Sequence, residues 1–484
     1  MTIEVLPLGV RCSLACTYCY QQPIRDAGNA LEPTYNMEAM KETLRKEGYK
    51  FTIFGGEPLL LPLKDLEELW RFGVEEFGDA TARRGEHPNS VQTHGADITD
   101  AHIALFQKYN VGVGMSIDGP DECNDARWSG SLERTRKTTR RSMTNLERLL
   151  ELKHPVSIIT TLTRMNASPE RLPKLVEWLR HLAIKGLHNV NLHLLEVETP
   201  EIRAELSLTP QENVKAILAI GALQDIVPLS VEPLTDIMHL LLGEDQWNPR
   251  EDGSFYSGTS CTWNGCDPYT TAAVHGVDGQ GNRGNCGRTC KEGPFWEKAS
   301  KVGYERYISL GHTPMAYDGC QGCRFFYGCK GHCPGEGLSS QGLSNDWRAK
   351  TEHCETLMAI FAAVEAELVR AGKQPMSLSP LRERLEQEMF KCWERGAHAP
   401  ITQIVAALKN GVDPQHGLQT VGVNIPHGDT PHGDHRDTVN PVHTHGDHQD
   451  GVSTPHGDHM DTVNPTVTHG DHTDNAGRMT WSAL

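Results

Sequence analysis

The sequence of 484 residues has no apolar run that approaches the ~20 residues needed to cross a bilayer. Its first ten residues, MTIEVLPLGV, lack the charged start and the apolar centre of a secretion signal. Basic residues are also few, with 46 Lys and Arg against 63 Asp and Glu and a formal net charge of −17. Because nucleic acids and anionic membranes repel an acidic surface, we expect neither as a partner, and we expect a cytoplasmic protein.

Cysteine, by contrast, is abundant for a chain without a secretion signal, with 14 residues. Disulfides are rare inside cells, so clustered cysteines in a long chain of this kind indicate metal binding. With 38% hydrophobic residues the chain can fill two or three packed units, which makes a globular enzyme the first expectation.

Short apolar runs rich in β-branched residues alternate with amphipathic stretches up to about residue 225. The runs predict strands at 3–9, 50–56, 90–95, 111–118, 156–163 and 190–196. Apolar residues at helical spacing predict helices at 37–48, 63–78, 100–109, 142–153 and 171–183. This alternation predicts an α/β fold in which about six parallel strands close partly into a TIM-type barrel, with the functional site at the carboxyl ends of the strands.

Composition divides the chain into further parts. Residues 1–225 form the predicted partial barrel, and 226–254 a linker. From 255 to 360 the sequence is rich in Gly, Cys, Asn and Tyr, which suits a small unit held together by metal. Apolar spacing predicts C-terminal helices within 361–411, whereas 412–484 is polar, low in complexity and predicted to be a disordered tail.

The first cysteine cluster is RCSLACTYC, in which Cys12, Cys16 and Cys19 follow the first predicted strand with the spacing C-x3-C-x2-C. Three thiolates on one loop can hold three corners of a cubane iron-sulfur cluster and leave the fourth iron open to a substrate or cofactor. The alternatives are a zinc knuckle that lacks its fourth ligand, or buried structural cysteines.

This spacing, with the aromatic Tyr18 before the last cysteine, resembles the signature of the radical S-adenosylmethionine (SAM) superfamily. FGGEP at the end of the second predicted strand resembles the family motif that binds the methionine amino group of SAM, which implies a binding role for Gly55, Gly56, Glu57 and Pro58. Two glycines let the backbone approach a ligand, and the glutamate offers negative charge or an acceptor.

SIDGP, which we assign to the fifth strand, resembles a segment of the peptide-modifying branch of this superfamily. The resemblance implies that Ser116 lies near the cofactor and that Asp118 faces the reaction space as a catalytic residue. Asp125 and Arg127 match a downstream D-x-R pattern. QTHGADITD resembles a T-N-G strand end with His94 in place of Asn, and His94 is equally compatible with a satisfied core residue.

The second group of cysteines resembles the SPASM extension of radical SAM enzymes in the order and gaps of its members. The resemblance implies two auxiliary 4Fe-4S clusters, one held by Cys261, Cys266, Cys286 and Cys333 and the other by Cys320, Cys323, Cys329 and Cys354. Cys290 lies in the same region and is a candidate hydrogen donor or alternative ligand, whereas Cys123 and Cys392 fit buried structural roles.

Together these resemblances imply three 4Fe-4S clusters and SAM as cofactors. The implied activity is that of an oxidoreductase which cleaves SAM reductively to a 5'-deoxyadenosyl radical and oxidises residues of a peptide or protein, with a reducing donor such as flavodoxin or ferredoxin. Similar enzymes are the anaerobic sulfatase maturases and the maturases of ribosomally made peptides. Because the first strand begins almost at Met1, we expect no N-terminal winged-helix module for leader-peptide capture.

The tail repeats itself, because most of residues 430–450 recurs 24 residues later, and HGDH begins at His432, His445, His456 and His469. Ten of the 24 histidines lie between His427 and His472. The tail is interpreted as a substrate in cis, as a metal reservoir or sensor, or as an inert extension. A flexible segment of ~40 residues spans roughly 30 to 40 Å, which is enough to reach a barrel mouth. The non-enzyme alternative is an iron-sulfur or metal-responsive regulator.

Overall fold

The computed structural model describes residues 2–22, 25–26, 34–48, 50–83, 85–196, 199–245, 248–249, 255–256, 263, 267, 269, 276–284, 286–289, 303–337, 346–415, 431–432 and 435–436. Cys261, Cys266 and Cys290 lie outside these residues, and so does almost all of the predicted tail. Within the described ranges no helix is both long enough and apolar enough to span a bilayer.

The central sheet confirms the six predicted strands. They are β1 (Ile3–Leu6), β2 (Phe51–Ile53), β3 (Asn89–Thr93), β4 (Val111–Ser116), β5 (Val156–Leu162) and β6 (Asn189–Leu194), and each is parallel to the next. Because all six point the same way, their carboxyl ends share one edge of the sheet. SIDGP follows β4, so its assignment to a fifth strand was wrong by one.

The sheet is longer than predicted at both ends. Beyond β6 lies the parallel strand β7 (Ser230–Glu232), and beyond β1 lie β10 (Gly276–Asp278), which is parallel, and β11 (Arg283–Gly284), which is antiparallel. The predicted linker 226–254 is therefore wrong, because it contains β7 and the helix α10 (Leu234–Leu242). A strand of three residues is too short to give a recognisable alternation.

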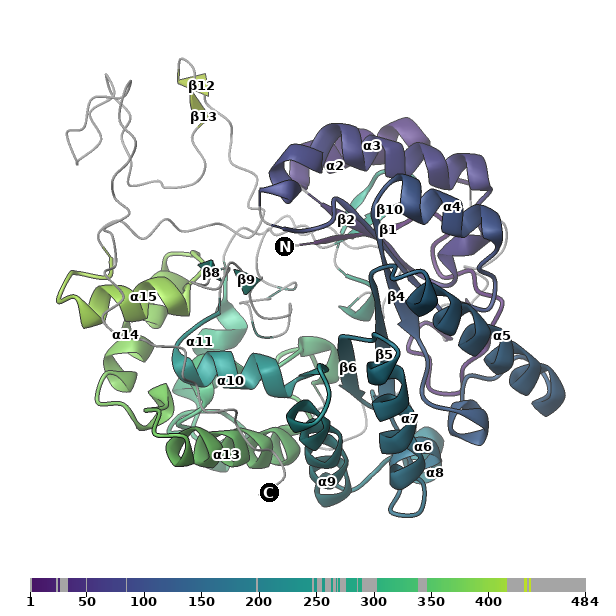
Figure 1. Cartoon of the computed structure of the whole chain (residues 1–484). Coiled ribbons are helices and arrows are strands. Elements are labelled where there is room, and N and C mark those ends of the chain that lie inside the picture. The colour runs from purple at the N-terminus through teal and green to yellow at the C-terminus, as the bar shows by residue number, and fades with distance from the viewer. Residues whose placement is uncertain are drawn as a thin grey trace.

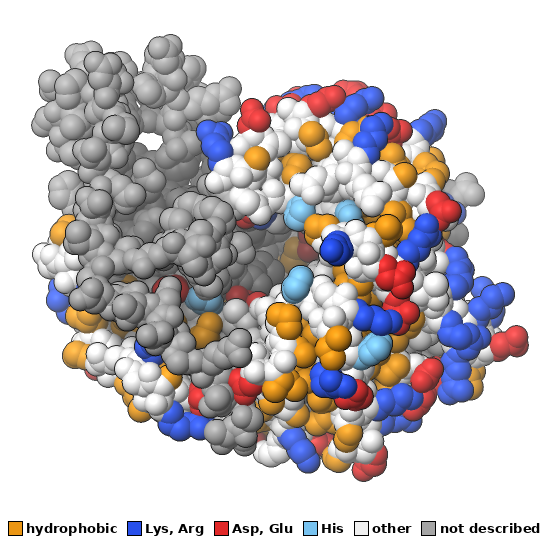
Figure 2. Space-filling view, in the orientation of Figure 1, with side chains coloured by type: hydrophobic (Ala, Val, Ile, Leu, Met, Phe, Trp, Pro, Cys, Tyr) orange, Lys and Arg blue, Asp and Glu red, His pale blue; other side chains and the backbone are white. Residues whose placement is uncertain are grey.

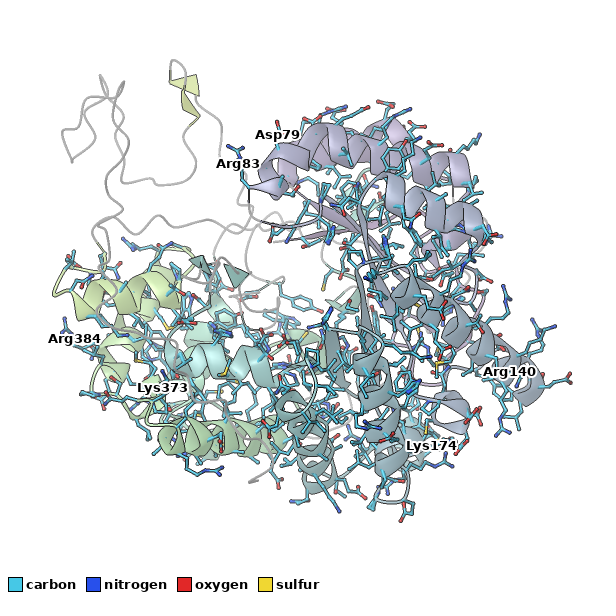
Figure 3. All side chains as sticks on the ribbon, in the orientation of Figure 1. Asp79, Arg83, Arg140, Lys174, Lys373 and Arg384 are labelled. Atoms are coloured by element: carbon cyan, nitrogen blue, oxygen red, sulfur yellow. The ribbon has the colours of Figure 1, made fainter. Side chains whose placement is uncertain are left out.

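Helices cover the outside of the sheet (Figure 1). The predicted helices are confirmed as α2 (Met37–Glu47), α3 (Leu63–Ala82), α4 (Asp100–Lys108), α5 (Leu132–Glu151) and α7 (Leu172–Ile184). Helix α5 begins ten residues before the predicted start because Ser131 caps it, its side chain accepting the Arg134 N–H. Charged side chains such as Arg140 and Lys174 point outward from these helices (Figure 3).

The remaining described elements are short or lie in the C-terminal half. They are α6 (Arg164–Ala167), α8 (Pro200–Leu206), α9 (Pro210–Gly221), β8 (Asn248–Pro249), β9 (Phe255–Tyr256), α11 (Glu305–His312), α12 (Phe326–Cys329), α13 (Cys354–Arg370), α14 (Arg382–Glu394), α15 (Ile401–Lys409), β12 (Pro431–His432) and β13 (His435–Arg436). The predicted C-terminal helices within 361–411 correspond to α13, which begins earlier at Cys354, and to α14.

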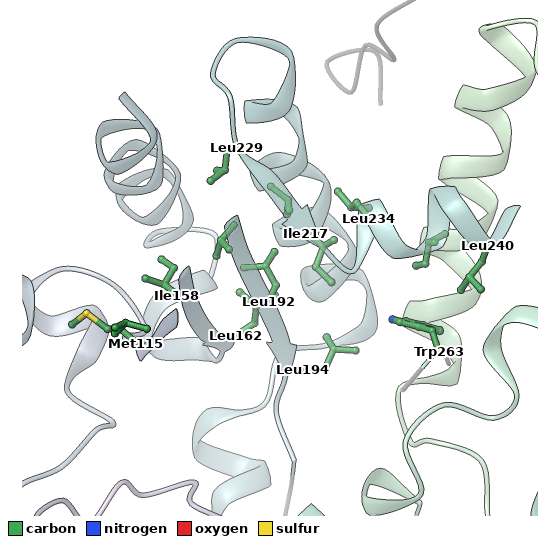
Figure 4. Packing of buried hydrophobic residues seen from close by; sticks show 14 of the residues in the cluster. Met115, Ile158, Leu162, Leu192, Leu194, Ile217, Leu229, Leu234, Leu240 and Trp263 are labelled. Carbon is green, nitrogen blue, oxygen red and sulfur yellow. The ribbon is translucent and has the colours of Figure 1, made fainter. Parts of the chain in front are cut away.

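One apolar core joins the barrel to the cysteine-rich part. In Figure 4 it runs from Met115 and Leu192 in the sheet through Leu234 and Leu240 of α10 to Trp263. Helix α13 packs on both α9 and α10. Removing this apolar area from water stabilises both parts together. The cysteine-rich part is therefore packed against the barrel and is not an independent domain on a linker.

A buried arginine organises the loop between Cys329 and Cys333. Arg306 of α11 is 2% exposed and donates to the carbonyl oxygens of Gly331 at 2.9 Å, His332 at 2.9 Å and Ala349 at 2.8 Å. A guanidinium carries five N–H donors, so one side chain can satisfy several buried carbonyls of an irregular loop.

We predict that Arg306→Gln lowers the free energy of unfolding by ~3 kcal/mol or more, because it leaves buried carbonyls without donors. The measurement is urea unfolding followed by circular dichroism. Arg348→Gln is the matched control, since Arg348 is 70% exposed in its ion pair with Asp346 and should change stability by less than ~1 kcal/mol. Equal effects of the two substitutions would contradict this account.

Candidate functional site

A cavity opens at the carboxyl ends of the strands, where the sequence predicted the site. Residues from the ends of β1 to β7 line it, including Cys12, Cys16, Cys19, Gly55, Gly56, Thr93, His94, Ser116, Thr161, His193 and Glu232. The three cysteines of the first cluster thus share one cavity with the two-glycine turn and with Ser116.

The cysteine loop is fixed on one side by the turn after β2. The N–H of Glu57 donates to the Arg11 carbonyl at 2.8 Å, and the N–H of Gly56 donates to Gln21 Oε1 at 3.0 Å. Gly56 has φ +52°, and a Cβ atom there would lie 1.9 Å from the Arg11 oxygen. Only glycine allows this close approach.

Glu57 is an internal brace of this turn. Its side chain is 0% exposed and accepts hydrogen bonds from Thr93 Oγ1 at 2.7 Å, from the His94 N–H at 3.0 Å and from the Leu59 N–H at 3.1 Å. The cavity lining includes neither Glu57 nor Pro58. The Glu57 carboxylate is therefore used inside the protein, and a role for this side chain in holding SAM stays a prediction.

His94 is a satisfied core residue, one of the two roles that its sequence allowed. Its Nδ1 accepts the Ala96 N–H at 3.1 Å, so the ring proton is on Nε2. That nitrogen lies 3.1 Å from Glu57 Oε2 and 2.9 Å from Ser13 Oγ. The histidine therefore links the strand end of β3 to the cysteine loop.

The other side of the cysteine loop is fixed by the segment after β4. The Ala15 N–H donates to the Trp128 carbonyl at 2.8 Å, and the Thr17 N–H donates to the Ala126 carbonyl at 2.9 Å. Tyr18 then donates its O–H to Asp118 Oδ2. The loop is thus held between two strand ends, with its cysteines facing the cavity.

Asp118 does not face the cavity, contrary to the sequence prediction. It is 1% exposed, and in addition to the Tyr18 O–H it accepts the Thr161 N–H at 3.0 Å. Tyr18, Ser116 and Arg127 line the cavity, but Asp118 does not. Asp118 therefore lies behind the residues that line the cavity, and a catalytic role for it stays a prediction.

The cavity lining also carries a network of charges that the sequence did not reveal. Arg288 in the 3-10 turn η5 (Gly287–Thr289) pairs with Glu196 after β6 and with Glu336 at 2.8 Å in the turn η7 (Pro334–Glu336). Burial raises the pKa of Glu336, but His332 and Arg288 outweigh it and hold that pKa well below its usual range. The pairing brings the segments of Cys286 and Cys333 beside the barrel.

Two further cavity carboxyls have raised pKa values. Burial raises the pKa of Glu4 to about 7, and burial together with the neighbouring Asp236 raises the pKa of Glu232 to about 8. Burial and Arg288 lower the pKa of His193 to about 3, so this histidine is neutral. Glu4 and Glu232 are 228 positions apart in the chain, so sequence spacing gave no signal that they line one cavity.

A second, smaller cavity is lined by all four cysteines of one predicted auxiliary set. They are Cys320, Cys323, Cys329 and Cys354, and Phe325, Leu357 and Phe361 close the space around them. Burial raises the pKa of Cys320 to about 12. Of the other predicted set, only Cys286 and Cys333 are described, whereas Cys261, Cys266 and the candidate hydrogen donor Cys290 lie outside the described residues.

The cysteine thiols of both cavities are of the donor type that iron-sulfur clusters take. Among the residues placed in the structure, no three His, Cys, Asp or Glu are grouped closely enough for one ion. A cubane distributes its thiolate ligands over different irons and so accepts a wider spacing. Both cavities combine cysteine with buried surroundings, which is the donor set that such a cluster requires.

The comparisons with known proteins agree with this site. Residues 6–179 match the family model described as the Radical SAM superfamily, so this part of the chain is a radical SAM domain. The chain is 31% identical over 137 residues to the serine-type anaerobic sulfatase-maturating enzyme of Bacteroides thetaiotaomicron, a match that covers 25% of this chain and 30% of that protein. It is 24% identical over 284 residues to the cysteine-type enzyme of Clostridium novyi, which covers 55% of this chain and 68% of that protein.

A solved structure described as native anSMEcpe with bound AdoMet superimposes with a TM-score of 0.53 at 18% identity, covering 76% of this chain and 98% of that chain. At this identity the likeness establishes the fold. The predicted relation to anaerobic sulfatase-maturating enzymes and the predicted α/β class are therefore confirmed. The match to the Bacteroides enzyme spans less than a third of its length, so activity and substrate remain matters for proposal.

We predict that Glu57→Gln lowers the free energy of unfolding by ~2 kcal/mol or more. The amide N–H of glutamine would face one of the N–H or O–H groups that now donate to the carboxylate. The measurement is chemical unfolding, combined with SAM affinity from calorimetry. Glu38→Gln is the control, since Glu38 is 75% exposed in its pair with Lys41. A loss of SAM affinity at unchanged stability would instead support direct contact between Glu57 and SAM.

Proposed function

We propose that this chain is a radical SAM enzyme that oxidises residues of a peptide or protein. One observation carries the proposal: the three cysteines of the first cluster line the same cavity as the Gly55-Gly56 turn and Ser116, at the carboxyl ends of the parallel strands. When bound there, SAM and a reduced cluster supply a 5'-deoxyadenosyl radical, which removes hydrogen from an unactivated C–H bond.

The residues of the cavity divide the work of binding. Cys12, Cys16 and Cys19 would hold a 4Fe-4S cluster with one iron open. The backbone of Gly55 and Gly56, which carries no Cβ atom, would let the methionine end of SAM approach closely. Ser116, which accepts the Gln92 amide N–H at 2.8 Å, also lines the cavity. These side chains orient the cofactor, and the difficult chemistry is the cofactor's own.

We propose two auxiliary 4Fe-4S clusters in addition, three clusters in all. One of them would be held by Cys320, Cys323, Cys329 and Cys354. The observation that these four cysteines line one cavity supports this assignment. Cys261, Cys266, Cys286 and Cys333 would hold the other. If each has four cysteine ligands, neither has an open iron, which favours roles in electron transfer and in stabilising the fold. A small reduced donor such as flavodoxin or ferredoxin would supply electrons.

The substrate class follows from the relatives. Their names describe maturation of sulfatases, and one solved structure with a TM-score of 0.52 is described as holding AdoMet and the Cp18Cys peptide. We propose a polypeptide segment as substrate here, with the chain's own HGDH repeat, or a separate peptide carrying it, as the candidate. Tethering gives a segment an effective concentration of about millimolar, so weak binding would suffice.

The cavity is compatible with a segment rich in aspartate. A carboxyl with a raised pKa is neutral over more of the pH range, which reduces its repulsion of a negatively charged ligand. Because Glu4 has a pKa of about 7 and Glu232 of about 8, both are largely or partly protonated near neutral pH. A second candidate role for the tail is metal storage, which its imidazoles and carboxylates favour.

We predict that anaerobically reconstituted protein contains roughly twelve irons and cleaves SAM to 5'-deoxyadenosine when reduced. The triple variant Cys12→Ala, Cys16→Ala, Cys19→Ala should lose about four irons and all SAM cleavage. Iron analysis and chromatography of the products measure both. Cys123→Ala is the control because Cys123 is a fully buried cysteine that lies outside both cysteine cavities. Cleavage by the triple variant would refute the proposal.

We predict that the repeat of the full-length chain, digested after anaerobic turnover, has lost ~2 Da for each oxidation that forms a new bond, which corresponds to two hydrogens. The comparison is the same digest from the Cys16→Ala chain, with mass spectrometry of the HGDH peptides. Identical masses under conditions in which wild type cleaves SAM would favour the metal-storage role. Calorimetric titration of the full-length chain with zinc then tests that role.

A further inference from the structure

Arg127 brings a positive charge to the wall of the SAM cavity. Its side chain is 13% exposed and lines the cavity beside Cys16 and Tyr18. It follows Ala126, whose carbonyl accepts the Thr17 N–H at 2.9 Å, so the backbone itself holds this arginine against the cysteine loop. Its Nη1 donates to the Tyr18 hydroxyl oxygen at 2.9 Å.

Asp118 supplies the matching negative charge on the side away from the cavity. It accepts the Tyr18 O–H, and one of its oxygens lies 4.0 Å from Arg127 Nη1. Its own backbone is fixed, since its N–H donates to Asn124 Oδ1 at 2.8 Å and its carbonyl accepts Asn166 Nδ2 at 2.8 Å. Arg127, Tyr18 and Asp118 therefore form a rigid, hydrogen-bonded triad, with the cation at the cavity and the anion behind it.

We propose that this triad sets the reduction potential of the cluster bound by Cys12, Cys16 and Cys19, with Arg127 as the positioning residue at the cluster and Asp118 as its counterion. Adding one electron makes a cluster more negative, so a nearby cation stabilises the reduced state and a nearby anion destabilises it. The inference rests on the proposed function, because it requires a cluster at these cysteines.

The charges of Arg127 and Asp118 act in opposite directions on the cluster. Buried charges act strongly because little water screens them. Groups that are hydrogen-bonded around the ligands of a cluster influence its reduction potential. Arg127 alone would raise the potential, and Asp118 partly offsets it through the shared Tyr18 oxygen. If the triad only supported the loop, the two substitutions would not shift the reduction potential in opposite directions. Removing either Arg127 or Asp118 would then loosen the same loop in the same way.

The test is a potentiometric titration of reconstituted full-length protein, following the cluster whose electron paramagnetic resonance signal changes on addition of SAM. Arg127→Gln should shift its potential to more negative values, and Asp118→Asn should shift it to more positive values. Arg127→Lys keeps the charge and should stay close to wild type. Arg136→Gln is the surface control, since Arg136 pairs with Asp125 at 3.0 Å and is 45% exposed.

Iron content and circular dichroism are measured for every variant. Shifts of the same sign for Arg127→Gln and Asp118→Asn, or no shift in either, would overturn the inference. If Arg127→Gln does not retain iron, the nearly isosteric Asp118→Asn decides, and any result other than a positive shift refutes the triad's role. A wild-type protein without a SAM-sensitive signal would refute the proposed function itself, which separates the two failures.

Discussion

The position of the cysteine loop between two strand ends is the constraint on which the rest of the site depends. Backbone hydrogen bonds fix it on both sides, from Glu57 to Arg11 and from Thr17 to Ala126. Such bonds join backbone groups and depend little on side chains. They therefore hold the cysteine loop at the carboxyl ends of β2 and β4. The glycines of the turn exist for the same reason, since a Cβ at Gly56 would collide with the Arg11 carbonyl. Because the loop is fixed, its three thiols face one cavity.

Buried charge completes what the backbone begins. Glu57, Asp118 and Glu336 are each nearly inaccessible to water, and each is satisfied by several donors. An unpaired charge that is buried away from water would destabilise the folded state. The donors around these carboxylates therefore have to keep one arrangement. Arg288 links two parts of the chain in the same way. It pairs with Glu196 after the end of β6 and with Glu336 near Cys333. The cysteine-rich part thereby becomes a wall of the barrel's own cavity.

The structure differs from the sequence predictions in the direction of two side chains and in the segment expected to be a linker, for two physical reasons. Asp118 lies in a motif typical of reaction sites, yet its carboxylate is used by Tyr18 and Thr161, and Glu57 likewise braces its own turn. A motif gives the residue type and its strand, but not which way the side chain is hydrogen-bonded. The region 226–254 was mistaken for a linker because β7 has only three residues, and its burial depends on β6 and α10.

The sequence by itself determined the six parallel strands, the helices between them and the cysteine spacing, because periodicity and spacing are local properties of the chain. It also indicated that the functional residues follow strand ends. Only the tertiary structure decided that Glu4, Glu232 and Arg288 line one cavity. It also decided that Arg306 supports the loop before Cys333, and that Arg127 faces the cavity while Asp118 lies behind it. Those relations join residues far apart in the chain, and packing and buried charge fix them only once the strands are side by side.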